Sequence, residues 1–340
     1  MEALGDVDRL VLLGDLLELR HGPVFEALGA AEAFARDVGE AMAGREIVLL
    51  AGNHDRALLE PWFERRRREG WPPPLGLEER VEIGADGALA TLVAGFKPAE
   101  VRVAYPGVWL RDDVYAFHGH YLDVHFTVPT FERLAAGIMR CVEGEVPERG
   151  AGPDDYERIL APLYAWLHAV AQAHPPERGV AKGQQTSAKL WRRLTAGSAH
   201  APLRSRVLRL GFGTAIAALN RTGIGPLRSE VSGAELRRAA LVAVGGAVAR
   251  LGIGADHVLF GHSHRSGPWP GDDPAEWRTP TGARLWNTGT WVWEPNFVTH
   301  RPNESPYWPG AGVRLGDAGR PEPVRLLADD AAEDLRPARA

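Results

Sequence analysis

Four short clusters along the chain contain side chains of the types that proteins use to bind divalent metal ions. They are Gly14-Asp15-Leu16-Leu17-Glu18, Gly52-Asn53-His54-Asp55, His118-Gly119-His120 and Gly261-His262-Ser263-His264. Imidazole, amide and carboxylate ligands together suit Mn²⁺, Fe²⁺ or Zn²⁺. A pair of such ions promotes phosphoester hydrolysis, because it lowers the pKa of a water molecule and neutralises the phosphoryl oxygens. The clusters therefore predict a site with two divalent metal ions.

No single cluster carries this interpretation alone. Gly14-Asp15 by itself is typical of a turn that ends a strand, and turns with exposed imidazoles would explain the other clusters one at a time. The joint pattern favours a metal site, because several separate strand ends would have to repeat the same coincidence. Glycine in each cluster also lets the backbone turn sharply, so that the ligands can converge.

Each cluster follows a short apolar run that is typical of a buried strand. The runs are 10–14, 47–52, 114–117 and 257–260. Apolar residues at helical spacing over 25–42 predict a helix between the first two strands, which gives a β-α-β unit. An α/β sheet binds ligands beyond the carboxyl ends of its strands, so the clusters are placed where a site is expected.

The chain divides into a core and a helical insertion. We expect the core to comprise 1–128 and 232–315, a mostly helical, basic cap to span 129–231, and a loose tail to follow over 316–340. The cap is predicted from apolar residues that recur every three to four positions. The tail is predicted from a composition rich in Asp, Ala, Pro and Arg without periodicity.

The four clusters, in this order, resemble the GD-x-x-E, GNHD, HGH and GHxH motifs of the calcineurin-like metallophosphoesterases. The resemblance covers 14–264, and the NTGTW of 287–291 also resembles the end of that domain. It implies a two-sheet α/β sandwich flanked by helices, and a hydrolase of phosphomonoester, phosphodiester or pyrophosphate bonds. GDLLE and HGHYLD are most similar to the branch that contains the UDP-diacylglucosamine pyrophosphatases. That branch commonly has Asp where this chain has His120, so the specific substrate does not carry over.

The resemblance also implies a role for each matching residue. Asp15 would bridge two metal ions, and His264 would bind the second ion. The ligands that complete the first ion would be Asn53, His118 and His262. His54 would lie over the substrate and assist the leaving group, with Asp55 as its orienting partner. His120 is expected on the substrate side of the site.

One motif of the family is not found in this sequence. Members begin with Asp-x-His at the end of a first strand, and this pair completes the second metal site. Asp6 and Asp8 precede the strand over 10–14, so they would lie about 15 Å or more from Asp15 at about 3.3 Å per residue. The second metal site is therefore incomplete. We expect a start codon assigned too far downstream rather than a natural one-metal variant. The alternative function is a non-catalytic metal-binding or anion-binding homologue.

The charge distribution predicts an anionic partner. The net charge is −5, yet the window 178–228 has ten Arg or Lys residues and no Asp or Glu. The candidate substrate-binding residues in this window are Arg192, Arg193, Arg206 and Arg209. A lipid-linked or nucleotide-linked phosphate, or an anionic membrane surface, would fit them, and a solvated arginine-rich face is the alternative. Only Trp191 and Phe212 offer stacking surfaces, which disfavours nucleic acid.

Composition is that of an ordinary globular protein, with 45% hydrophobic and 24% charged residues, which excludes a disordered or fibrous chain. The single cysteine, Cys141, excludes an intrachain disulfide and fits a reducing compartment. We therefore expect a cytoplasmic location, with peripheral membrane contact through the basic window. Neither a membrane-spanning helix nor a signal peptide is predicted, since the chain has no apolar run of about 18 residues and no leader pattern.

Overall fold

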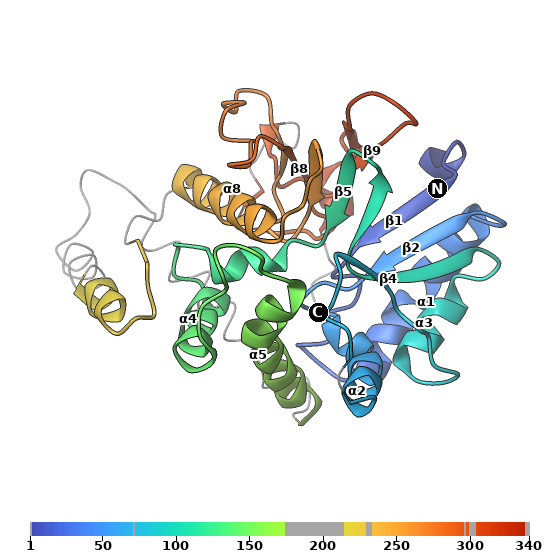
Figure 1. Ribbon diagram of the computed structural model, residues 1–340. Helices are drawn as coiled ribbons and strands as arrows, with labels where there is room; N and C mark the ends of the chain where they lie inside the picture. Colours follow the sequence, from blue (N-terminus) through green and yellow to red (C-terminus); the bar gives the residue numbers. More distant parts are fainter. Residues whose placement is uncertain are drawn as a thin grey trace.

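The computed structural model describes residues 2–70, 72–173, 214–228, 233–295, 297–298 and 304–336. Within these ranges the protein is an α/β fold, with one mixed, curled sheet of eight strands, a second sheet of two strands, and flanking helices (Figure 1). The large sheet follows the order β1-β2-β4-β5-β6-β8-β7, and β3 pairs with β4 beside this path.

The N-terminal half of the large sheet is parallel. β1 (Arg9–Leu13) pairs with β2 (Glu46–Leu50), and β2 pairs with the first part of β4 (Glu100–Arg111). Helix α1 (Val24–Ala41) connects β1 to β2, which confirms the predicted β-α-β unit. The other elements of this half are η1 (Glu2–Leu4), η2 (Arg56–Leu59), α2 (Glu60–Arg68), β3 (Glu78–Arg80) and α3 (Ala88–Gly95).

The second half of the sheet begins where β4 changes partner. The last residues of β4 pair with β5 (Val114–Phe117) in the antiparallel sense. Beyond β5, the strands β5, β6 (His257–Phe260) and β8 (Arg284–Thr288) run parallel to one another. The short edge strand β7 (Ser266–Gly267) pairs with β8. Helix α8 (Gly233–Arg250) leads into β6 and lies beside this half in Figure 1.

Along each strand, alternate residues face opposite sides of the sheet and therefore belong to different cores. In β2, Ile47 and Leu49 pack in the core that contains α1, whereas Val48 and Leu50 face the other way. In β5, Tyr115 and Phe117 likewise belong to the core under α8. The residues that face away from the helices come from both halves and form one further core. This period of two is the burial pattern of a sheet covered on both faces.

Between the two halves of the core, the chain forms η3 (His120–Val124), α4 (Phe131–Glu143) and α5 (Pro153–Ala173), and 214–221 is also helical. Apart from η3, which precedes residue 129, these elements fall within the predicted helical cap, of which 174–213 and 229–231 lie outside the described residues. Among the described helices, none is both long and apolar enough to cross a membrane.

The segment for which the sequence predicts a loose tail contains two regular elements. β10 (Glu322–Arg325) pairs antiparallel with β9 (Ala311–Arg314), and α9 (Ala332–Leu335) follows. The ladder gives this part of the tail a fixed place beside β9. The apolar periodicity is too short here to have indicated a strand.

Candidate metal centre

The loops that follow β1 and β2 lie against each other at the edge of the sheet. Gly14 has a positive φ of 91°, and a Cβ there would meet the backbone of Gly52. A Cβ on Gly52 would overlap the carboxylate of Asp15. Glycine at both positions therefore lets Asp15 reach the loop after β2.

Asp55 ties these two loops together. Its carboxylate accepts hydrogen bonds from the backbone N–H groups of Gly52, at 2.7 Å, and Leu16, at 2.8 Å. The side chain is buried, and burial together with the charge of Asp15 raises the pKa of Asp55 to about 6. The structure thus places Asp55 against the backbone of the loops, whereas the sequence suggested it as the orienting partner of His54.

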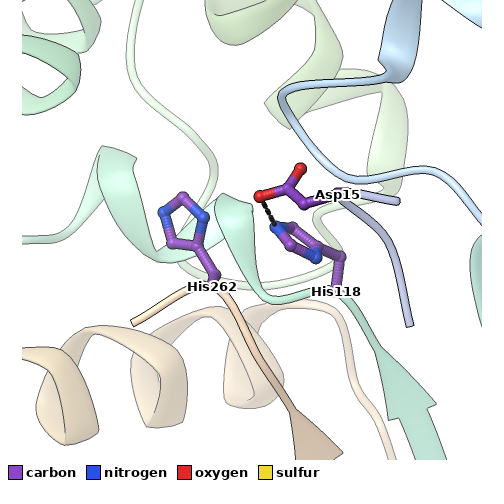
Figure 2. Close-up of side chains that lie close together, drawn as sticks. All are labelled: Asp15, His118 and His262. Atoms are coloured by element: carbon purple, nitrogen blue, oxygen red, sulfur yellow. Dashed lines mark ion pairs between the residues drawn. The ribbon is translucent and has the colours of Figure 1, made fainter. Parts of the chain in front are cut away.

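Four ligand atoms converge at this edge, and we call their residues Asp15, Asn53, His118 and His262 the cation cluster. Asp15 Oδ2 lies 3.1 Å from His118 Nε2. Asn53 Oδ1 lies 3.2 Å from His118 Nε2 and 3.0 Å from His262 Nδ1. Figure 2 shows Asp15, His118 and His262 turned toward one another, and one ligand atom from each lies within 4.8 Å of the others.

Hydrogen bonds behind the two histidines aim their lone pairs into the cluster. His118 Nδ1 lies 2.8 Å from the carbonyl oxygen of Leu13, to which it donates. His262 Nε2 lies 3.1 Å from Asp123 Oδ1 and donates to it. In each neutral ring the other nitrogen then carries no proton and faces Asn53. Such bonds behind a histidine are the usual way in which proteins orient a metal ligand.

The charges in the cluster reinforce this arrangement. Burial opposes ionisation of Asp15, but the charge and hydrogen bond of His118 hold the pKa of Asp15 well below its ordinary value. Burial also opposes protonation of His118, but Asp15 raises the pKa of this imidazole overall. The metal-free cluster therefore attracts positive charge, which a proton or a metal ion can supply.

The backbone of the site adopts a rare conformation at three candidate ligand positions. Asp15, His262 and His264 have φ values of 56°, 62° and 59°, and no other non-glycine residue in the described part of the chain has a positive φ. This region costs a residue with a Cβ about 1–2 kcal/mol. Strain of this kind concentrates at functional sites, because the surrounding structure holds side chains where they are needed.

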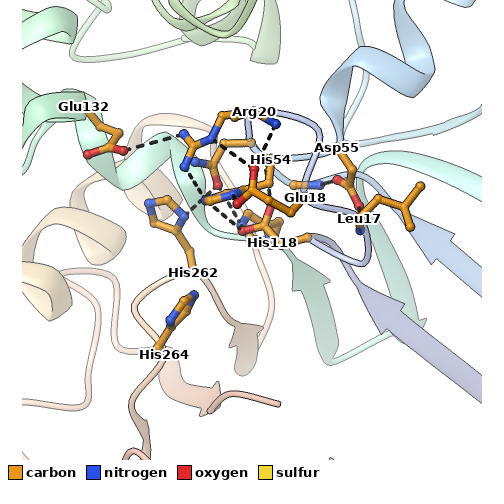
Figure 3. Close-up of polar contacts among 12 residues, drawn as sticks. Leu17, Glu18, Arg20, His54, Asp55, His118, Glu132, His262 and His264 are labelled. Carbon is orange, nitrogen blue, oxygen red and sulfur yellow. Dashed lines mark hydrogen bonds and ion pairs between the residues drawn. The ribbon is translucent and has the colours of Figure 1, made fainter. Parts of the chain in front are cut away.

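His54 lies beside the cation cluster and is held from two sides (Figure 3). Glu18 Oε2 accepts from its Nδ1 at 2.5 Å, and a guanidinium N–H of Arg20 meets its Nε2. Nε2 is also 3.9 Å from Asp15 Oδ2. Burial opposes ionisation of Glu18, yet the hydrogen bond from His54 lowers the pKa of this carboxyl overall. Glu18, rather than Asp55, is thus the residue that orients His54 in the structure.

His264 follows the cation cluster but stands slightly apart from it (Figure 3). Its Nδ1 lies 3.8 Å from Glu294 Oε1, and burial lowers the pKa of the imidazole to about 4. Burial also raises the pKa of Glu294. A neutral imidazole next to an acidic oxygen is a suitable pair of ligand groups, and Asp15 lies close enough for its charge to act on His264.

His120 points away from the substrate side that the sequence suggested. It is buried, with Nε2 3.5 Å from the hydroxyl of Tyr105 and with the rings of Tyr121 and Tyr164 against its edge. Burial, and after it the charge of His118, hold the pKa of His120 well below its ordinary value. The structure therefore places this imidazole in a tyrosine-lined core behind the cation cluster.

A cavity of about 660 Å³ opens in front of the centre. Its lining includes polar side chains of the centre, namely Asp15, Asn53, His54, His262 and His264, and also the apolar Phe126, Leu236 and Trp277. The cavity thus offers both polar groups and apolar surface. Such a lining suits a ligand that has both a charged and an apolar part.

Besides Glu294, the structure adds three residues to those suggested by the sequence. Glu18 and Arg20 hold His54, and Asp123 orients His262. Glu18 and Asp123 belong to the quoted GDLLE and HGHYLD patterns, which give no hint of these contacts. The candidate substrate-binding residues Arg192, Arg193, Arg206 and Arg209 lie outside the described residues.

No family model, curated protein or solved structure matches the chain.

Proposed function

We propose that the protein is a metal-dependent phosphoester hydrolase of the calcineurin-like metallophosphoesterase type. The observation that carries this proposal is the cation cluster, in which one ligand atom each from Asp15, His118 and His262 lies within 4.8 Å of the others and the Asn53 amide lies against both imidazoles. Carboxylate and imidazole groups gathered in this way supply the lone pairs that a divalent cation needs as ligands. The motif order and the curled sheet, whose helix-free faces share one core, support the sandwich fold of that family.

The residues present fit a divalent ion of the Mn²⁺, Fe²⁺ or Zn²⁺ group, with Asp15, Asn53, His118 and His262 as ligands. Such an ion supplies Lewis-acid activation of water and of the phosphoryl group. His264 and Asp15 would hold a second ion, and Glu294 offers a further oxygen 3.8 Å from His264 Nδ1.

In the proposed reaction, His54 assists the leaving group from the wall of the cavity. Glu18 fixes its Nδ1, so Nε2 is the nitrogen that can exchange a proton with a substrate oxygen. Nε2 must then give up its contact with Arg20 in favour of that oxygen. The mixed lining of the cavity supports a phosphorylated small molecule or a lipid-linked or nucleotide-linked phosphate as substrate.

Hydrolysis of bis(4-nitrophenyl) phosphate and 4-nitrophenyl phosphate with added Mn²⁺ tests the proposal. We expect turnover that a chelator stops and that Asp15→Ala and His262→Ala abolish. Binding of Mn²⁺ without turnover of either ester would instead favour the non-catalytic metal-binding alternative. Turnover that survives both substitutions would place the chemistry elsewhere on the molecule.

A further inference from the structure

Arg133 is a buried arginine whose two terminal nitrogens have no partner in the part of the chain that the structure describes. Its side chain is 0% exposed and is the largest of the fully buried side chains there. Nε donates to the carbonyl oxygen of Phe126, but Nη1 and Nη2 have no hydrogen-bond partner. A buried charge without a partner is strongly destabilising. Arg133 therefore offers two charged donors to a group that the described residues do not supply.

Two further arginines belong to the same place. Arg140 lies two turns after Arg133 in α4, with Gly137 between them on one helix face. A Cβ on Gly137 would lie 2.8 Å from Arg133 Nη1, so glycine makes room for the guanidinium. Arg250 ends α8, and η3 packs against both α4 and α8. The Nε atoms of Arg140 and Arg250 are also buried without a partner.

We call Arg133, Arg140 and Arg250 the arginine cluster, and its charges act together on His125, which directly follows η3. Burial, and after it the charges of these three arginines, lower the pKa of His125 to about 3. Burial, and after it the charge of Arg140, also lower the pKa of Arg133 to about 10. The three guanidinium groups thus lie near enough to one another to concentrate positive charge at the junction of α4, η3 and α8.

The two carboxylates whose charges act on Arg133 do not neutralise the arginine cluster. Glu145 Oε1 pairs with Arg140 Nη2 at 2.5 Å, but the Glu145 side chain is 71% exposed. Asp123 acts on Arg133 at longer range, and its Oδ1 is already bonded to His262. Neither carboxylate forms a hydrogen bond with Nη1 or Nη2 of Arg133. The arginine cluster therefore keeps a net positive charge in a buried place.

We propose that the arginine cluster binds one small tetrahedral oxyanion, such as sulfate or phosphate, at the junction of α4, η3 and α8. The two Nη atoms of Arg133 form a fork that matches two oxygens of such an ion, and Arg140 and Arg250 offer one further N–H each. Because Arg133 has no exposed surface, a free ion fits better than a phosphate carried on a larger molecule.

This oxyanion site is separate from the metal centre. None of the three arginines lines the cavity in front of the cation cluster, so the inference does not depend on the proposed function. Helix α4 belongs to the inserted segment, and α8 belongs to the second part of the core. A bound ion would therefore link the inserted segment to the core.

The test is calorimetric titration of the full chain with sodium sulfate, at constant ionic strength and without added metal. The wild type should bind one sulfate ion per chain. Arg133→Met and Arg250→Met should each weaken sulfate binding by roughly tenfold or more, the effect of losing charged hydrogen bonds. Arg102→Met is the matched control, because Arg102 is also partly buried but is held by Glu46 and Glu78. This control should bind sulfate like the wild type.

Thermal unfolding separates loss of the oxyanion site from misfolding. Without sulfate, Arg133→Met should be at least as stable as the wild type, because methionine removes an unpaired buried charge. Saturating sulfate should raise the Tm of the wild type and of Arg102→Met more than that of Arg133→Met. The inference is overturned if the wild type binds no sulfate, or if Arg133→Met binds it with wild-type affinity. A large loss of stability in Arg133→Met without sulfate would also overturn it, since the folded chain would then already satisfy Arg133.

Discussion

Asp123 Oδ1 lies 3.1 Å from Nε2 of His262, which is 139 residues further along the chain, and this bond aims Nδ1 of His262 at Asn53. Asp123→Ala should therefore weaken Mn²⁺ binding by roughly 10- to 100-fold, the usual effect of losing the partner behind a metal-binding histidine. Asp123→Asn retains an acceptor and should lose less. Calorimetric titration checks both variants. An alanine variant with wild-type affinity would mean that another group orients His262.

The two histidines of the HGH motif should differ sharply in their effect on metal binding. His118→Ala removes a ligand atom that lies 3.1 Å from Asp15, so it should abolish stoichiometric Mn²⁺ binding. His120→Phe should leave the stoichiometry unchanged, because His120 lies among tyrosines and away from the cavity. Metal analysis after gel filtration gives both values. Metal loss in both variants would contradict the placement of His120.

Substitutions of the two carboxylates near His54, Glu18 and Asp55, should have different effects. Glu18→Ala removes the acceptor on His54 Nδ1 at a half-exposed position, so it should lower kcat roughly tenfold or more with little change in Tm. Asp55→Ala leaves the buried N–H groups of Gly52 and Leu16 unpaired and should reduce the free energy of unfolding by about 2–4 kcal/mol. Thermal unfolding and turnover are measured for both variants. A loss of turnover in Asp55→Ala together with a loss of stability in Glu18→Ala would instead make Asp55 the partner of His54.

Metal binding should weaken in acid. Asp15 raises the pKa of His118 above its ordinary value, and a metal ion must displace the proton that this imidazole holds. Below the raised pKa the Mn²⁺ affinity should fall by up to tenfold per pH unit, and well above it the affinity should be constant. His264, with a pKa of about 4, adds no proton at neutral pH. Calorimetric titrations with Mn²⁺ in buffers of different protonation enthalpy give the number of protons released on binding. If no proton is released near neutral pH, the proposed role of His118 is wrong.

Gly52→Ala should abolish metal binding although it adds a single methyl group. The new Cβ would overlap the carboxylate of Asp15 and push the two loops apart. Gly29→Ala is the matched control, because Gly29 lies in α1 with nothing near its added Cβ. That change should raise the free energy of unfolding by about 0.4–1 kcal/mol and leave Mn²⁺ affinity unchanged. Intact metal binding in Gly52→Ala would show that the loops can separate without loss of the site.

Much of the fold is predictable from short patterns. The strands β1, β2, β5 and β6 stand out as apolar runs that end in glycine or a polar residue, and α1 as a helical repeat. The sequence does not predict β4, because Tyr105-Pro106-Gly107 interrupts its apolar residues in the manner of a turn. In the structure this tripeptide lies where β4 leaves β2 and begins to pair with β5. Proline is tolerated there because the ladder changes at that point.

The candidate ligands are predictable and the residues that support them are not. Asp15, Asn53 and His262 follow strand ends in recurrent motifs, so their types and order indicate a site. The partners Glu18 and Asp123 act on His54 and His262 across 36 and 139 positions, and only the folded loops bring them together. His120 shows the opposite case, since its motif suggests the substrate side while its neighbours bury it.

At Asp15, His262 and His264, which have a left-handed backbone, selection for stability and selection for metal binding favour different residues. Glycine would relieve strain at each position, so a search for heat-resistant variants alone would tend to accept it there. Every such gain would delete a candidate ligand. In a lineage that no longer used the centre, we therefore expect glycine or asparagine to accumulate at these three positions early, while the hydrophobic cores remained unchanged.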